Sequence, residues 1–302
     1  IVTVSCESTL TPKYKINRIR VLAIQADPVE FVADEDDIKN PSFPAHTMFR
    51  ALAIDPDDIA GVNIKYHWES MIPEFSEFVR SESSTLFLDF SNNDSASINP
   101  FKPLDSVDRV KKDLSVVPKN TVLQIPIQLQ IRDDNNQVVE SAIKSLYLTL
   151  IDKGQIPSQK RCSVALNELS VEHIDLNSDT STTTNFQQAI DYSLASLRSA
   201  DLLSNSIQKN SRYKLSIKKF FHYWYWDKSD PSCQNVDDDV KIEWYATHGK
   251  FETTKNRYEK IWIASDEDTD SESNTVQLVL VMRDKSGASD WWRLYGTYEN
   301  IK

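Results

Sequence analysis

Glycine is scarce in this chain, with five residues among 302. They are scattered along the sequence, at Gly61, Gly154, Gly249, Gly287 and Gly296. Loops that cradle phosphate need clustered glycines, because the backbone must approach the ligand closely. The sequence has no GxGxxG motif, no Walker-type loop and no nucleophile elbow. Nucleotide chemistry is therefore not expected.

Basic residues and long apolar runs are also few. The 34 Lys and Arg residues are outnumbered by 45 Asp and Glu residues, which gives a net charge of −11. A nucleic-acid binder needs a basic face, and docking on anionic lipid needs a polybasic patch, so neither is expected. The sequence has no run of 18 apolar residues, so it does not predict a membrane-spanning helix. The length and the 40% hydrophobic content predict a globular protein of two domains.

Three cysteines make an odd count, which suggests one pair and one special thiol. Cys162 and Cys233 are the expected disulfide, which would stabilise the fold by about 2–4 kcal/mol in an oxidising compartment. Cys6 follows a β-branched run that ends in Ser5 and precedes a polar segment. This pattern resembles the end of a bacterial lipoprotein signal peptide, with Thr3 where leucine is usual. The resemblance implies lipid attachment at Cys6 and a tether over residues 1–16. The alternative is a short edge strand over residues 1–5 and an ordinary cysteine.

Alternating apolar and polar residues predict strands along most of the chain. In the first half, Val62, Ile64, Tyr66 and Trp68 fall on one face of such a segment. Pro126 cannot donate to a β-ladder, so its strand is expected at a sheet edge or with a bulge. The expected strands lie at 18–28, 47–54, 62–69, 122–131, 138–150, 162–171, 213–226, 240–245, 276–282 and 291–298.

Two segments depart from the alternation. Residues 70–119 are rich in Ser, Asn, Asp and Pro around one short apolar island, 86–90, and predict a long insertion or loop. In residues 185–207 apolar side chains recur at three- and four-residue steps, which predicts an amphipathic helix. This helix would cover a face of its own domain or dock a partner.

The two halves of the sequence repeat one pattern. Val62–Trp68 aligns with Asp239–Trp244, and a later hairpin opens with Arg132-Asp133 in one half and Arg283-Asp284 in the other. Duplication of one antiparallel unit explains both matches. The expected fold is therefore mainly β, with two immunoglobulin-like antiparallel β-sandwich domains over residues 17–153 and 157–302 and the helical insertion in the second. Trp68, Trp244 and Trp262 are the expected core tryptophans.

Residues 240–251, 261–265 and 276–292 resemble the immunoglobulin-like, PKD- or cadherin-type repeats of secreted bacterial surface lipoproteins. The resemblance implies a non-enzymatic protein with a structural, adhesive or scaffolding role. It implies partners among other envelope proteins, and a membrane contact through the lipid anchor. The expected location is the bacterial cell envelope, anchored to the outer membrane and facing the periplasm or the surface.

Candidate chemistry is sparse. The five histidines fall on separate strands and turns without metal-ligand spacing, so no catalytic residue and no zinc site is expected. Acidic loops offer oxygen ligands for calcium, the one cofactor considered, although Asp is common in solvated turns anyway. The calcium candidates are Asp237, Asp239, Asp266, Asp268 and Asp270.

Aromatic residues are dense in two places, and consecutive aromatics on a strand point to opposite faces. An outward row could stack on a glycan or contact a partner, and the alternative is packing between the domains. The residues concerned are Tyr223, Tyr225, Trp226, Trp291 and Trp292. Carbohydrate binding through them is the second expectation for function, and an enzyme with its site in the 70–119 insertion is the third.

Overall fold

A computed structural model of the chain describes residues 13–34, 36, 46–57, 64–72, 85–89, 122–174, 181–187, 201–208, 210–224, 233, 240–265 and 275–298. Across these ranges the elements are sixteen strands, which form four sheets. The described ranges contain no helical element. The chain is mainly β, as expected. Within the described ranges, no helix has the length and hydropathy to cross a bilayer.

The N-terminal half places its strands in two sheets around one core. The strands are β1 (Arg20–Asp27), β2 (Glu30–Ala33), β3 (His46–Ile54), β4 (Lys65–Ser70), β5 (Thr85–Asp89), β6 (Val122–Arg132) and β7 (Val138–Leu150). One sheet has the order β1-β3-β5 and the other the order β2-β7-β6-β4. Trp68 is fully buried in the core between them and lies 6.1 Å from the ring of Phe49.

The C-terminal half repeats this arrangement on a larger scale. Its strands are β8 (Ser163–Ile174), β9 (Ser181–Gln187), β10 (Asp201–Ile207), β11 (Arg212–Tyr223), β12 (Lys241–Ala246), β13 (Lys250–Glu252), β14 (Glu259–Ile263), β15 (Thr275–Arg283) and β16 (Ser289–Tyr298). The sheets have the orders β13-β14-β11-β8-β9 and β10-β16-β15-β12. Their shared core contains Trp244, Trp262 and Trp292.

The strand orders of the two halves correspond. Sheet β1-β3-β5 matches β8-β11-β14, and β2-β7-β6-β4 matches β10-β16-β15-β12, while β9 and β13 are additions. In both halves the strand at the same position joins its sheet in parallel, β2 beside β7 and β10 beside β16. This partition is that of immunoglobulin strands A, B and E against C, F and G, with Trp68 and Trp244 on the two C strands.

The hairpins that open with Arg-Asp turn in the same way in both halves. The backbone N–H of Asp133 donates to Gln137 O at 2.9 Å, and that of Asp284 donates to Ala288 O at 3.0 Å. Each Asp carboxylate accepts the N–H four residues on, at 2.8 Å in both turns. The residue before that N–H has a left-handed backbone, with φ 62° at Asn136 and 90° at Gly287. Asn and Gly tolerate that conformation, which explains why they stand there.

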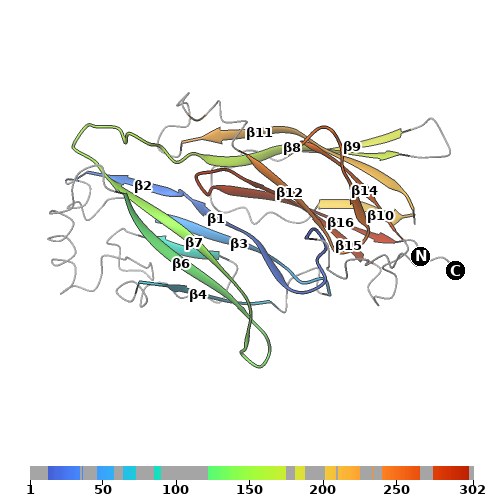
Figure 1. Ribbon diagram of the computed structural model, residues 1–302, viewed down its shortest axis with the longest axis horizontal. Coiled ribbons are helices and arrows are strands. Elements are labelled where there is room, and N and C mark those ends of the chain that lie inside the picture. The colour runs from blue at the N-terminus through green and yellow to red at the C-terminus, as the bar shows by residue number, and fades with distance from the viewer. Residues whose placement is uncertain are drawn as a thin grey trace, which may run out of the picture.

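A third core joins the two halves face to face. It contains Ile16, Leu22, Ala23, Leu52, Ile54, Tyr245, Val279, Val281 and Trp291. Apart from Ile16, which precedes β1, these residues come from β1 and β3 on one side and from β12, β15 and β16 on the other. Figure 1 shows the resulting stack, with β8 and β11 at the top, then β12, β15 and β16, then β1 and β3, and β4, β6 and β7 at the bottom. The strand β15 is buried on both faces because it lies inside this stack.

The predicted helix over 185–207 is wrong at both of its ends. Residues 185–187 belong to β9, which pairs with β8, and residues 201–207 form β10, which pairs with β16. Both segments form edge strands of their sheets. In β9, the residues just before the predicted helix, Thr182–Thr184, are β-branched, which favours the extended form. Residues 188–200 lie outside the described part of the chain.

Three further expectations need correction. The insertion at 70–119 contributes a strand, since β5 pairs with β3, and most of its other residues lie outside the described ranges. Residues 14–16 of the predicted tether pair with β12, where Ile16 N–H donates to Ala246 O at 2.8 Å. Pro126 lies in the inner strand β6, without a bulge at that point. Its carbonyl accepts the N–H of Met71 at 3.1 Å, directly after β4 ends at Ser70, so its missing N–H falls where the ladder stops.

Candidate functional site

The linker between the halves is clamped to the first one by a buried carboxylate. Glu30, whose side chain is 1% exposed, accepts hydrogen bonds from the backbone N–H of Arg161 at 3.1 Å and from its guanidinium at 2.9 Å. The hydroxyl of Thr149 also donates to Glu30. The guanidinium lies 4.1 Å from the ring centroid of Tyr147. A buried charge is stable only when paired and hydrogen-bonded, so this clamp fixes the start of the second half.

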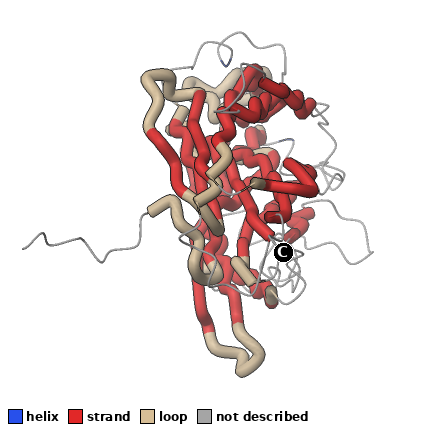
Figure 2. Tube along the Cα trace, turned by 90° about the vertical axis from the view of Figure 1, so that its right-hand side faces the viewer, coloured by secondary structure: helices blue, strands red, loops and turns tan. Residues whose placement is uncertain are grey.

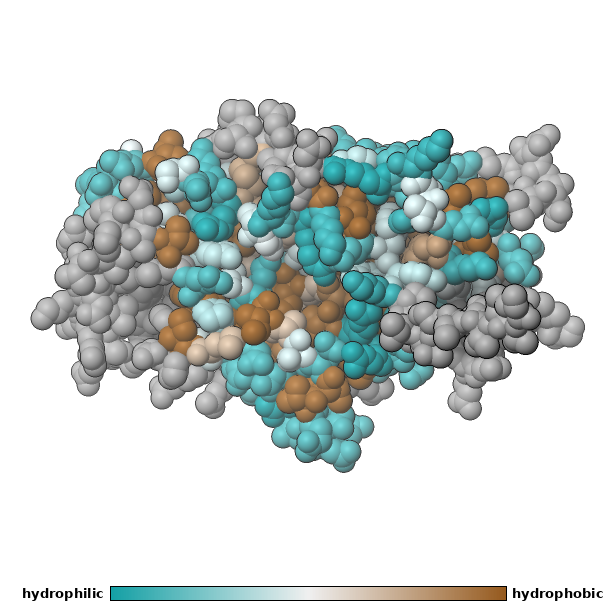
Figure 3. All heavy atoms as spheres, in the orientation of Figure 1, coloured by the Kyte–Doolittle hydropathy of each residue, from teal (hydrophilic) through white to brown (hydrophobic). Residues whose placement is uncertain are grey.

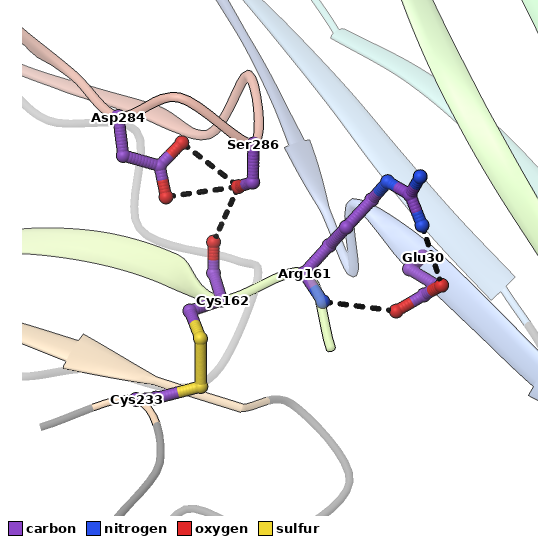
Figure 4. The surroundings of a disulfide bond; sticks show 6 residues. All are labelled: Glu30, Arg161, Cys162, Cys233, Asp284 and Ser286. Carbon is purple, nitrogen blue, oxygen red and sulfur yellow. Dashed lines mark hydrogen bonds and ion pairs between the residues drawn. A yellow bond between two sulfur atoms is a disulfide. The ribbon is translucent and has the colours of Figure 1, made fainter. Parts of the chain in front are cut away.

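The next residue of the linker is held to the second half. Cys162 forms the expected disulfide with Cys233, with Cα atoms 5.7 Å apart. Its carbonyl accepts a hydrogen bond from Ser286 Oγ at 3.0 Å, and Ser286 Oγ lies 2.8 Å from both carboxylate oxygens of Asp284. Figure 4 shows Arg161 and Cys162 side by side, with the first reaching Glu30 and the second reaching the β15–β16 turn. The linker is therefore attached to both halves within two residues.

A groove opens beside this attachment. It has a volume of about 390 Å³ and lies between β1, the β7 segment Ala142–Tyr147 and the β15–β16 turn. Its apolar walls include Val21, Ile24 and Ile143. On the face shown in Figure 3, hydrophobic surface is exposed at the middle of the molecule, where β1 and β7 pass in Figure 1, and again toward the β6–β7 hairpin.

The charged side chains that line the groove are both cations. Lys144 donates to Gly287 O, so it ties β7 to the β15–β16 turn. Burial lowers the pKa of Lys144 to about 8, while the charge of Asp284 raises it and that of Arg283 lowers it further. Arg283 donates to Leu22 O and pairs with Glu243. Among the described residues, no carboxylate and no histidine lines the groove, so it does not join the acid and base groups that hydrolysis would need.

A set of buried polar side chains lies deeper in the junction. Tyr223 is buried, and its pKa is raised first by burial and then by the charges of Asp27 and Asp290. Asp290 accepts the backbone N–H of Leu166 at 2.6 Å. Arg50 donates to Gln25 and lies 5.8 Å from the ring centroid of Trp291. Tyr223, Asp290 and Gln25 are buried and Arg50 is half-buried, and their contacts join the strands on which they lie.

The aromatic candidates for glycan contact do not form a surface. Tyr223, Trp291 and Trp292 are buried, with Trp291 in the third core and Trp292 in the core of the second half. Trp291 packs between the halves, which was the alternative expectation for these aromatic residues. Tyr225 and Trp226 lie outside the described residues. The glycan expectation therefore has no described residue in its support.

The remaining sequence-predicted residues divide into buried and undescribed ones. Trp68, Trp244 and Trp262 are all buried in the cores. The lipid-attachment residue Cys6 and the calcium candidates Asp237, Asp239, Asp266, Asp268 and Asp270 lie outside the described ranges. Within those ranges, no group of three or more His, Cys, Asp or Glu side chains is arranged to hold a metal ion.

Sequence reasoning missed the clamp and the groove. Glu30 and Arg161 are 131 residues apart, and Lys144 and Gly287 are 143 apart. One local signal was available, since Glu30 interrupts an apolar segment between Val29 and Phe31 where a charge needs a partner. Nothing local singles out Lys144.

Comparisons with known proteins return structures alone. No family model and no curated protein matches the sequence. Drosophila N-cadherin EC1-3 is 10% identical, with 94% of this chain and 68% of that chain covered and a TM-score of 0.27. The tandem Ig repeats of Dlar are 8% identical, with 94% and 97% covered and a TM-score of 0.26. For protocadherin gamma B7 domains 1–4 the identity is 13%, the coverage 91% and 49%, and the TM-score 0.20. TM-scores this low carry no argument, and the immunoglobulin-like assignment rests on the strand order.

Proposed function

We propose that this chain is a non-enzymatic protein of the cell envelope or surface, in which the paired sandwiches act as a structural, adhesive or scaffolding module. The observation that carries the proposal is the third core. It joins the two sandwiches along their faces, with Leu22 and Leu52 against Val279 and Trp291. The clamp at Glu30 and the disulfide at Cys162 add two further attachments. A body joined in this way holds its surfaces at fixed relative positions, which a scaffold requires.

The β6–β7 hairpin is the surface that we assign to a protein partner. It projects from the stack at the bottom of Figures 1 and 2. Val138 is 51% exposed and Ile143 is 56% exposed. Within the described residues, β2 pairs with β7 only over Tyr147–Leu150, so β7 pairs on one side alone over 138–146. An open strand edge with exposed apolar side chains is a common site of strand addition by a partner.

Site-specific photocrosslinking in the native cell tests this assignment. A photoreactive amino acid replaces Val139 in one variant and Lys250 in another. Val139 is on the hairpin, and Lys250 is an exposed residue of β13 on the opposite outer sheet. We expect one discrete protein adduct from position 139 and none from position 250. Equal adducts from both positions, or none from either, contradict the proposal.

A second part of the proposal is the location. We propose that Cys6 carries a lipid that anchors the chain to the outer membrane of a bacterial envelope, facing the periplasm or the surface. The support is the sequence pattern around Cys6, together with a disulfide of the kind that persists in an oxidising compartment. Detergent phase partitioning of the native protein and of Cys6→Ser tests it. The native protein is expected in the detergent phase and the variant in the aqueous phase. Partitioning into detergent by both contradicts the anchor.

A further inference from the structure

The groove beside the linker has the chemistry of a binding site. Its walls at Val21, Ile24, Ala142 and Ile143 are apolar, and its volume of about 390 Å³ falls in the range of small-molecule sites, about 300–1,000 Å³. The chain as a whole has a net charge of −11, yet the charged residues of this lining are Lys144 and Arg283. A groove with apolar walls on one side, cations and hydroxyls on the other, and no lining carboxylate favours an anion attached to an apolar body.

The two cations differ in what they can offer a ligand. Arg283 is engaged with Glu243 and with Leu22 O, so its charge is already compensated. Lys144 has one hydrogen-bond acceptor among the described residues, Gly287 O. An ammonium has three N–H donors, so two remain. The lining hydroxyl of Ser289 is committed to Ile24 O at 2.7 Å. Of the two cations, Lys144 is therefore the one with donors left for an incoming anion.

We propose that this groove binds a carboxylate carried on an apolar chain, with Lys144 holding the carboxylate and the β1 and β7 walls holding the chain. The inference does not depend on the scaffolding role proposed above. A peptide strand cannot add to β1 in this groove, because the carbonyls of Leu22 and Ile24 already accept hydrogen bonds from Arg283 and Ser289. A strand that adds to an edge needs such carbonyls as acceptors. The strand addition proposed above is to the hairpin end of β7, over residues 138–141, which lies outside the groove lining.

The lowered proton affinity of Lys144 supports the proposal and gives it a signature. Burial brings the pKa of Lys144 down to about 8, with the charge of Asp284 acting to raise it and that of Arg283 to lower it. A carboxylate beside the ammonium favours the charged form, so binding raises that pKa. Binding near pH 8.5 therefore takes up a proton, whereas binding near pH 6.5 does not.

Isothermal titration of the purified chain with decanoate tests these statements. Decanol is the neutral ligand control. Lys144→Gln removes the charge, and Lys285→Gln removes an exposed lysine of the neighbouring turn. We expect saturable one-to-one binding of decanoate, weakened at least tenfold by Lys144→Gln and unchanged by Lys285→Gln. Decanol should bind at least tenfold more weakly than decanoate. Titrations in two buffers of different ionisation enthalpy should show proton uptake at pH 8.5.

Three results overturn the proposal. The first is the absence of saturable binding. The second is decanoate affinity that Lys144→Gln leaves unchanged while circular dichroism shows that the variant is folded. The third is tighter binding of a short peptide with a free C-terminal carboxylate than of decanoate, because that result assigns the groove to a peptide end.

Discussion

Trp291 and Trp292 are adjacent on β16 and pack into different cores, which makes them a matched pair. Trp291 lies in the third core, between the halves, and is 6% exposed. Trp292 lies in the core of the second half and is 2% exposed. Removal of a buried tryptophan to alanine costs about 3–5 kcal/mol in free energy of unfolding. The two substitutions are therefore similar in size but act on different layers.

We expect Trp291→Ala to weaken the attachment between the halves. The loss includes the contact of Arg50 with the indole ring, at 5.8 Å, which contributes about 0.5–1 kcal/mol. Each half keeps its own core, so unfolding in urea should separate into two transitions. Trp292→Ala should instead lower the stability of the second half and leave β6 and β7 protected. Circular dichroism reports the transitions, and hydrogen exchange of β6–β7 and β11–β14 peptides assigns them.

Two outcomes refute the reasoning. If Trp291→Ala leaves the unfolding midpoint unchanged, the third core does not contribute to stability. If Trp291→Ala and Trp292→Ala give the same exchange pattern, the chain unfolds as one unit and the division into three cores has no energetic meaning.

Three other changes have expected outcomes. Gly249 has φ 76°, and a Cβ there would collide with the Trp262 indole. Gly249→Ala should therefore lower the free energy of unfolding, measured in urea, by more than about 1 kcal/mol. A variant as stable as the wild type would contradict this. Cys162→Ser should cost about 2–4 kcal/mol at the same readout, as should reduction of the native protein, and no loss in either case would mean that the disulfide is not stabilising. Burial lowers the pKa of Lys144 to about 8 from 10.5, so the unfolded chain binds more protons between those values and stability should rise with pH across that window, by up to about 3 kcal/mol. Lys144→Met should abolish this rise, and an identical pH dependence in the variant would contradict the assignment.

The repeat could be predicted because it depends on local sequence patterns, namely the alternation of apolar residues and the residue types of the turns. Alternation at period two places Trp68 on an inward face without reference to the rest of the chain. The turns at Asp133 and Asp284 follow from residue types that suit a left-handed position. The strands that carry Trp68 and Trp244 and the two matching hairpins were therefore accessible from the amino-acid sequence.

The helix expected over 185–207 shows that a local periodicity does not by itself decide secondary structure. Apolar residues at three- and four-residue steps satisfy a helix, yet Phe186 pairs with Leu169 in β9, and Leu202 pairs with Tyr295 in β10. Open edges of β8 and β16 compete for these segments, and strand pairing depends on partners that a local window does not contain.

The amino-acid sequence by itself determined ten of the sixteen described strands, their inward faces and the repeated pattern, because each depends on neighbours within a few residues. Tertiary structure alone decided that the two sandwiches stack through a third core, that Glu30 meets Arg161, and that Lys144 faces the β15–β16 turn across a groove. These contacts join residues more than 100 positions apart, and their free energy comes from burial and pairing that exist only once both halves are folded.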